Sequence, residues 1–294
     1  MKPQRKTLHI IGMTAYALIL FILLTFYRMP AGKLFAAAVD NISEGKVHLS
    51  MKKISPGLPG YYTLEEVTLA IATGDGIARD AVNMLVLKLD YLNLFKGYLP
   101  LKFAAIMPEG TVHGKAGISM INRLKDGYFY LTIEDIELSD LSILQSLLGR
   151  QVKGKLDGKL AFNGNLADFV KLDGEGRLNV TEGGIDTRFD LPGMTSIPFK
   201  SLKVVFNLKG GMVKLDEGEM IGPMFSGTYS GEIRLNKVLQ QSRINVLGEM
   251  TPGPMIASNK LAGQLLSGIM KEEKSVKVMV MGTLERPSII RRKN

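Results

Sequence analysis

Three histidines are the side chains of this 294-residue chain best suited to proton transfer or metal binding near neutral pH. They are His9, His48 and His113. No two of them lie at the spacing of a shared metal site, and none belongs to an H-E-x-x-H helix. We therefore expect His48 and His113 to be surface residues of strands, and His9 to border an apolar segment.

The remaining catalytic chemistries also lack their residues. The chain has no cysteine, which excludes disulfides, thiolate catalysis and cysteine-ligated metals. No G-x-S-x-G nucleophile turn is present. Two glycine pairs, at 74–76 and 174–176, are not phosphate loops because no Lys-Ser/Thr and no helix start follows them. The sequence thus predicts a protein that is not an enzyme and that binds no metal or other cofactor.

The charge of the chain argues against nucleic acid as a partner. The net charge is +9, and the first 30 residues supply +4 of it because they contain four basic residues and no acid. The remaining +5 is spread along the chain, without the clustered Lys/Arg of a nucleic-acid-binding patch. A mild attraction to anionic lipid head groups is compatible with this charge.

Alternating apolar and polar residues from Val152 to Thr181 predict two β-strands with one apolar and one polar face. The turn between them is expected at 163–165, where Asn-Gly-Asn tolerates positive φ. Gly154 and Gly158 fall on the apolar face and leave it shallow. Either another group lies close to the backbone there or the sheet bends sharply.

The same alternation recurs from Lys46 to Leu284 and predicts about 15 strands in all. A phase slip near Glu65–Glu66 predicts a β-bulge. Few short helices are expected: 34–42, 91–97, 259–270 and 139–148, the last capped by Ser139 or Asp140 and ended by Gly149. They are too few to cover so many apolar strand faces. The fold is therefore predicted to be mainly β, with a long antiparallel sheet that covers itself as a sandwich, a closed barrel or a curled, half-open trough.

The segment 10–27 contains no charged residue and is long enough to cross a bilayer as a helix. Basic residues precede it, so the sequence predicts a cytoplasmic tail at 1–9, a single transmembrane anchor at 10–27 and a body outside the cytoplasm at 28–294, with a possible division near 138–150. The alternative is a cleaved signal peptide, for which Ala36 and Ala38 could form the cleavage site.

The glycine-and-leucine patterns resemble those of a known group of envelope proteins. The stretch 154–164 (GKLDGKLAFNG), the stretch 172–180 (LDGEGRLNV) and the end at 278–287 (VMVMGTLERP) are similar to the AsmA-like module. With one N-terminal span and a β-rich body, the whole chain resembles the type II secretion system protein N (GspN) family. That resemblance implies a single-pass protein of the bacterial inner membrane, with its bulk in the periplasm, associated with protein secretion and without catalytic residues.

Two functions follow as hypotheses. The first is a non-enzymatic component of the type II secretion system, whose partners would be other secretion proteins. The second is an AsmA-like trough that binds or transfers a lipid such as phospholipid or lipid A. The candidate lining residues of the trough lie on the apolar strand faces: Leu156, Leu160, Phe162, Leu178, Val204, Phe206, Phe225, Tyr229 and Ile233. The same residues could instead form the dry core of a sandwich.

Overall fold

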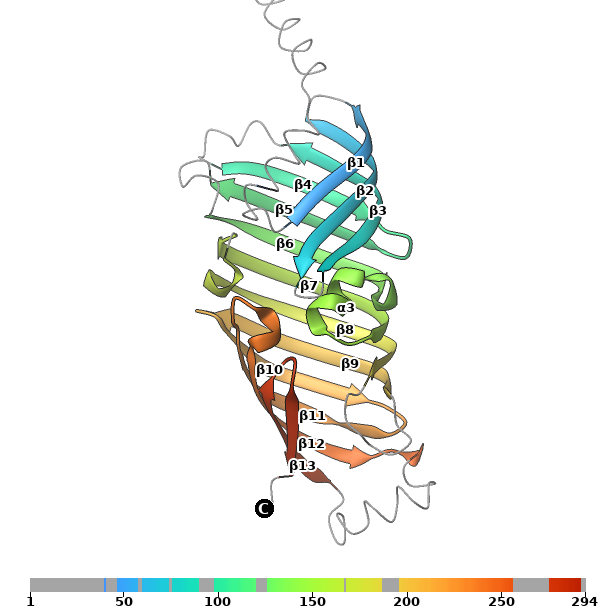
Figure 1. Cartoon of the computed structure of the whole chain (residues 1–294), viewed down its shortest axis with the longest axis vertical. Helices are drawn as coiled ribbons and strands as arrows, with labels where there is room; N and C mark the ends of the chain where they lie inside the picture. Colours follow the sequence, from blue (N-terminus) through green and yellow to red (C-terminus); the bar gives the residue numbers. More distant parts are fainter. Residues whose placement is uncertain are drawn as a thin grey trace, which may run out of the picture.

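The computed structural model describes residue 40 and residues 47–57, 60–73, 76–89, 98–119, 126–166, 168–186, 196–255 and 275–291. These residues form one antiparallel sheet of 14 strands, in which each strand pairs with the next one along the chain (Figure 1). The strands are β1 (Val47–Pro56), β2 (Tyr61–Thr73), β3 (Gly76–Leu89), β4 (Tyr98–Ile106), β5 (Thr111–Ser119), β6 (Asp126–Glu137), β7 (Val152–Asn165), β8 (Leu172–Asp186), β9 (Ser196–Lys209), β10 (Met212–Ile221), β11 (Phe225–Arg234), β12 (Arg243–Pro252), β13 (Val276–Thr283) and β14 (Pro287–Arg291). The prediction of a mainly β protein with a long antiparallel sheet and few helices is confirmed.

The sheet continues without a break across the helical segment near its middle. β6 pairs directly with β7, although η2 (Leu138–Asp140) and α3 (Ser142–Leu148) lie between them in the chain. Besides the helical residues Asp40 and 254–255, the only other helical elements described are η3 (Phe169–Lys171) and η4 (Leu239–Gln241). The described residues therefore contain a single β layer rather than two stacked sheets.

The cross-strand register separates an apolar face from a polar face. Leu131, Leu160 and Gly176 stand opposite one another on β6, β7 and β8, on what we call the apolar face. Lys159 and Arg177 stand opposite each other on the other side, which we call the polar face. Because side chains alternate along a strand, this register places the apolar residues of successive strands together.

The phase slip near Glu65–Glu66 is present as a corner in the sheet, but the predicted β-bulge is wrong, because the pairing of β2 with β1 and with β3 keeps the same register on both sides of Glu66. Leu64 is 0% exposed and Val67 is 1% exposed, although strict alternation would place them on opposite faces. Glu66 lies between them with φ 52°, in the left-handed region, and this conformation switches the parity of the strand. Leu64 and Val67 both belong to the buried cluster of the N-terminal strands.

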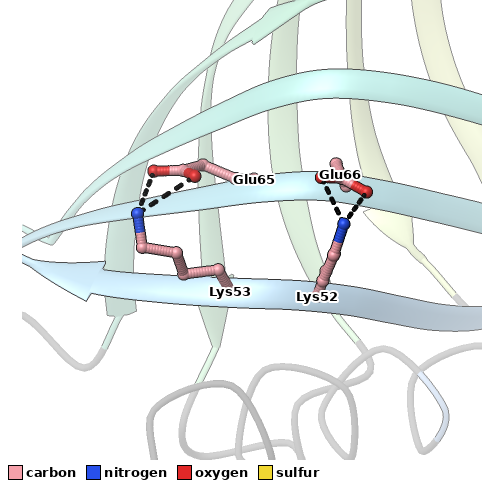
Figure 2. Close-up of polar contacts among 4 residues, drawn as sticks. All are labelled: Lys52, Lys53, Glu65 and Glu66. Carbon is pink, nitrogen blue, oxygen red and sulfur yellow. Dashed lines mark hydrogen bonds and ion pairs between the residues drawn. The ribbon is translucent and has the colours of Figure 1, made fainter.

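The outer side of the corner carries two parallel ion pairs (Figure 2). Lys52 Nζ lies 2.8 Å from Glu66 Oε1, and Lys53 Nζ lies 3.0 Å from Glu65 Oε1. The hydrogen bond with Glu66, followed by the charge of that carboxylate, raises the pKa of Lys52. The four side chains are between 41% and 72% exposed, so the two ion pairs are open to solvent and contribute little to the stability of the corner.

The central helix starts later than the sequence suggests, and the predicted cap is wrong. α3 follows Leu141, which makes no side-chain capping bond, and neither Ser139 nor Asp140 caps the helix. Instead, the carboxylate of Asp80 on β3 accepts from the N–H of Ile143, with both oxygens 3.3 Å away. This acceptor comes from a distant strand, so local sequence could not indicate it. The predicted stop is confirmed, because Gly149 adopts φ 63° at the end of the helix.

α3 lies on the apolar face and joins distant parts of the sheet (Figure 1). Its contacts include β2 and β3 on one side and η4 on the other. The guanidinium of Arg150, just after the helix, donates to the carbonyl of Leu284 in the β13–β14 turn at 3.0 Å. Since these partners come from both ends of the chain, the sheet must curl around α3 on this face.

The predicted turn at 163–165 is also wrong, because β7 continues to Asn165 and the chain turns afterwards, at Leu166 and through η3. The expected helices at 91–97 and 259–270 lie outside the described residues, as does that at 34–42 except for Asp40. The predicted anchor at 10–27 lies outside them too. None of the helices among the described residues is long and apolar enough to span a membrane.

Candidate functional site

All nine candidate lining residues lie on the apolar face, and all nine are half-buried. β7 contributes three of them, β8 one, β9 two and β11 three. The register brings some of them together directly: Leu178 stands opposite Val204. The residues of β11 are different, because β10 separates them from the residues of β9.

An aromatic group occupies the middle of the apolar face. The ring centroids of Phe129 and Phe162 are 5.1 Å apart, and those of Phe162 and Phe206 are 6.3 Å apart. The rings are tilted toward one another, which is a favourable arrangement for aromatic pairs. They form a continuous apolar surface from β6 to β9.

The glycines of the apolar face are covered by these rings. A Cβ on Gly174 would overlap the ring of Phe162 opposite, and one on Gly176 would overlap the ring of Phe206 opposite.

The sequence left two alternatives open at Gly154 and Gly158. At Gly158 the close approach of another group applies, because an added Cβ would lie 2.5 Å from Leu178 Cδ2. At Gly154, the bend applies as well, because this residue has φ 119° at a break in the β7–β8 register.

Tyr229 crosses the face over another glycine and ends in a hydrogen bond. A Cβ on Gly218 would overlap its ring, and its hydroxyl donates to the carbonyl of Lys203 at 2.9 Å. Burial raises the pKa of Tyr229 to about 12. The phenol is therefore neutral at physiological pH and serves to hold the ring in place rather than to transfer protons.

The cover over the apolar face is partial. Leu141, Leu144 and Leu148 of the α3 segment pack against Val152 and against other residues where β7–β9 begin or end. Leu156 packs against the same cluster, and all nine candidate residues, on β7–β9 and β11, keep part of their surface exposed. No second sheet lies over them among the described residues. In a dry sandwich core, facing side chains would exclude water from both layers.

The polar face carries two grooves that the sequence did not indicate. One, of about 910 Å³, spans β8 to β13, and the other, of about 800 Å³, spans β6 to β10. Arg177, Asn179, Val205 and Asp216 line both grooves, so each groove contains both a basic and an acidic side chain. The Oδ1 atom of Asn179 is buried and has no hydrogen-bond partner in the described part of the chain. Only the register reveals these grooves, because their walls come from strands that are far apart in sequence.

The described ranges also bear on the expectation that the histidines bind no metal. These residues contain no group of three or more His, Cys, Asp or Glu side chains that could hold a metal ion. His113 Nε2 lies 3.3 Å from Glu134 Oε2, and His48 Nδ1 lies 2.9 Å from Asp40 Oδ1, all on exposed side chains. The two described histidines are thus surface residues, as the sequence predicts.

Comparison of the chain with known protein families, with curated proteins and with solved structures finds no match.

Proposed function

We propose that this protein is a non-enzymatic envelope protein that binds the acyl chains of a lipid along the apolar face of its sheet. The observation that carries this proposal is the half-buried state of the nine residues on that face. An apolar surface of this extent, left partly open, is stabilised when an apolar ligand covers it. Phospholipid and lipid A both supply such chains.

The curl of the sheet supports the same function. β1–β3 lie at one end and β13–β14 at the other, and both ends approach α3 on the apolar face (Figure 1). A trough of this form would shelter acyl chains and leave a head group in water. The proposal includes the single-span anchor at 10–27, which would hold the trough beside the bacterial inner membrane with its bulk in the periplasm.

Val204 and Val205 offer a matched test. They are neighbours on β9 and both half-buried, but Val204 lies on the apolar face and Val205 lines the grooves of the polar face. A photo-crosslinking amino acid at each position of the full chain, activated in cells, should capture lipid from position 204 and not from 205. Mass spectrometry of the adduct identifies the lipid. Equal capture from both positions, or none from 204, contradicts the proposal.

Association with a type II secretion system is a second candidate, and the open edges of the sheet favour it. β1 and β14 each have a strand neighbour on one side only among the described residues. An exposed edge can accept a strand from another protein. Ile290 on β14 is 48% exposed and lies at such an edge.

Deletion of the gene and crosslinking from the edge test this second role. If the role is correct, deletion reduces secretion of folded proteins, and a photo-crosslinker at position 290 captures a component of the secretion assembly. Secretion that is unchanged in the deletion strain counts against the role, while lipid capture at position 204 would remain unaffected by that result.

A further inference from the structure

Three lysines stand directly opposite one another on adjacent strands of the polar face. Lys88 on β3 pairs in register with Lys102 on β4, which pairs with Lys115 on β5. Neighbouring strands lie about 4.8 Å apart, so the row brings three positive charges across roughly 10 Å. Like charges directly opposite each other destabilise a sheet. A group that interacts favourably with these positive charges would therefore stabilise the sheet.

The protein itself supplies aromatic rings at both ends of the row. Lys88 Nζ lies 4.7 Å from the ring centroid of Tyr61, which is its register partner on β2. Lys115 Nζ lies 4.7 Å from the ring centroid of Tyr130, its partner on β6. The outer lysines thus lean away from Lys102, and all three side chains are exposed. We call these five residues the lysine row.

No carboxylate neutralises the lysine row within the described part of the chain. Glu134 and Glu65, two acids that the register places on this face near the row, have other partners: Glu134 contacts His113, and Glu65 pairs with Lys53. The positive charge of the row is therefore open to an external anion.

Exposed apolar side chains flank the row on the same face. Met84 is 36% exposed and stands opposite Ile106, which is 41% exposed. Tyr130 at the end of the row is 45% exposed. Lysines beside exposed apolar and aromatic side chains are the composition of a surface that lies at the interface of an anionic bilayer.

The position of the row in the chain fits this partner. Nineteen residues separate Tyr27, at the end of the apolar segment, from Val47 at the start of β1. Even at full extension such a tether spans only roughly 65 Å. A chain anchored through residues 10–27 would hold the N-terminal strands within reach of the membrane surface.

We propose that the lysine row, with Met84 and Ile106, docks the polar face of β2–β6 onto an anionic phospholipid bilayer. This surface lies on the opposite side of the sheet from the lipid-binding face proposed above, so either assignment can fail without the other.

The absence of cysteine from the chain allows a site-specific test on the full protein. Ala104 lies beside the row on β4, between Val86 and His113, and Thr228 lies on the same face of β11. Ala104→Cys and Thr228→Cys each receive an environment-sensitive fluorophore. The proteins are reconstituted into phosphatidylcholine vesicles, with or without about one third phosphatidylglycerol, and brominated lipid serves as the quencher. Quenching is expected only for the label at 104 and only with phosphatidylglycerol.

Charge variants of the labelled protein complete the experiment. Each lysine near an anionic surface changes binding about fivefold, so K88Q/K102Q/K115Q should lower the ratio of docked to undocked protein roughly a hundredfold. The matched control K153Q/K200Q/K209Q removes three exposed lysines elsewhere and should leave the ratio unchanged. K88R/K102R/K115R should retain docking, and high salt should abolish it.

The proposal is overturned if the label at 104 is not quenched, if it is quenched equally in phosphatidylcholine alone, or if the two glutamine triples behave alike. Capture of an acidic protein by the row, without quenching by anionic lipid, also overturns it. If the K88Q/K102Q/K115Q variant does not fold, docking is still tested, because the salt dependence is measured on protein that keeps all three lysines.

Discussion

A methyl group added at Gly176 tests whether aromatic rings cover the glycines of the apolar face. The added Cβ would overlap the far edge of the Phe206 ring and would lie 2.7 Å from Leu160 Cδ2. The ring must move by roughly an ångström, and overpacking of this kind costs about 1–3 kcal/mol. Replacing glycine by alanine returns about 0.4–1 kcal/mol by restricting the unfolded chain. We expect Gly176→Ala to lower the free energy of unfolding by about 1 kcal/mol.

Gly184 provides the matched control on the same strand. Its added Cβ would have Ile197 O as nearest neighbour at 3.6 Å, an ordinary contact, and its φ lies outside the left-handed region. Gly184→Ala should therefore leave the protein unchanged or more stable by about 0.4–1 kcal/mol. Urea unfolding of the full chain in mild detergent, followed by far-ultraviolet circular dichroism, measures both variants.

A double-mutant cycle isolates the ring. Phe206→Leu removes the two ring atoms nearest to the new methyl group and leaves Leu160 Cδ2, so Gly176→Ala should cost less in the Phe206→Leu background than alone. The difference should be about 1 kcal/mol, as expected for residues in direct contact. If Gly176→Ala is as stable as Gly184→Ala, or if the cycle shows no coupling, the ring does not cover Gly176 and the reasoning is wrong.

Three further predictions concern the hydrogen bond between Asp80 and the start of α3, the corner at Glu66 and the buried phenol of Tyr229. Asp80→Ala removes the acceptor for the N–H of Ile143 and should lower the free energy of unfolding in urea by about 1 kcal/mol. Asp80→Asn keeps an acceptor and should lower it by less. Equal values for the two variants would mean that this hydrogen bond contributes nothing. Glu66 has φ 52°, so Glu66→Val should destabilise the protein by at least about 1 kcal/mol, whereas Glu66→Gly should be tolerated. The reverse order of stability would contradict the left-handed backbone at this residue. Burial raises the pKa of Tyr229 to about 12, whereas the pKa of a tyrosine in the unfolded chain is about 10. The unfolded state therefore loses this proton first, so the stabilisation is complete below about pH 10 and is lost as the pH rises toward about 12. Tyr229→Phe should show a smaller decline of unfolding free energy over this range, and an identical decline would argue against the raised pKa.

Local patterns in the sequence were enough for several parts of the fold. The alternation from Val152 to Thr181 predicts β7 and β8 and assigns their side chains to the correct faces. The phase slip at Glu65–Glu66 marks the position where the strand changes parity, although not the β-bulge that it predicts, and Gly149 predicts the end of α3. These features depend on neighbours a few residues away, so the sequence displays them directly.

Predictions failed where a distant partner overrides local preference. Gly164 takes φ 121°, as a turn residue could, yet it stays in β7 because Gly127 and Leu172 pair with it from the two neighbouring strands. The start of α3 similarly depends on Asp80, which is 63 positions from Ile143 in the chain. In both cases the deciding hydrogen bonds come from elements that sequence patterns cannot bring together.

The candidate site also has features that the sequence predicts and features that depend on strand pairing. Alternation by itself determined that Leu156, Val204 and the other seven candidates share an apolar face, because a strand presents every second residue to one side. Only the tertiary structure decided that the described part of this face carries α3 but no second sheet, and that Lys88, Lys102 and Lys115 form a row on the other face. The physical reason is that alternation is a property of each strand alone, whereas register and curl are set by pairing between strands.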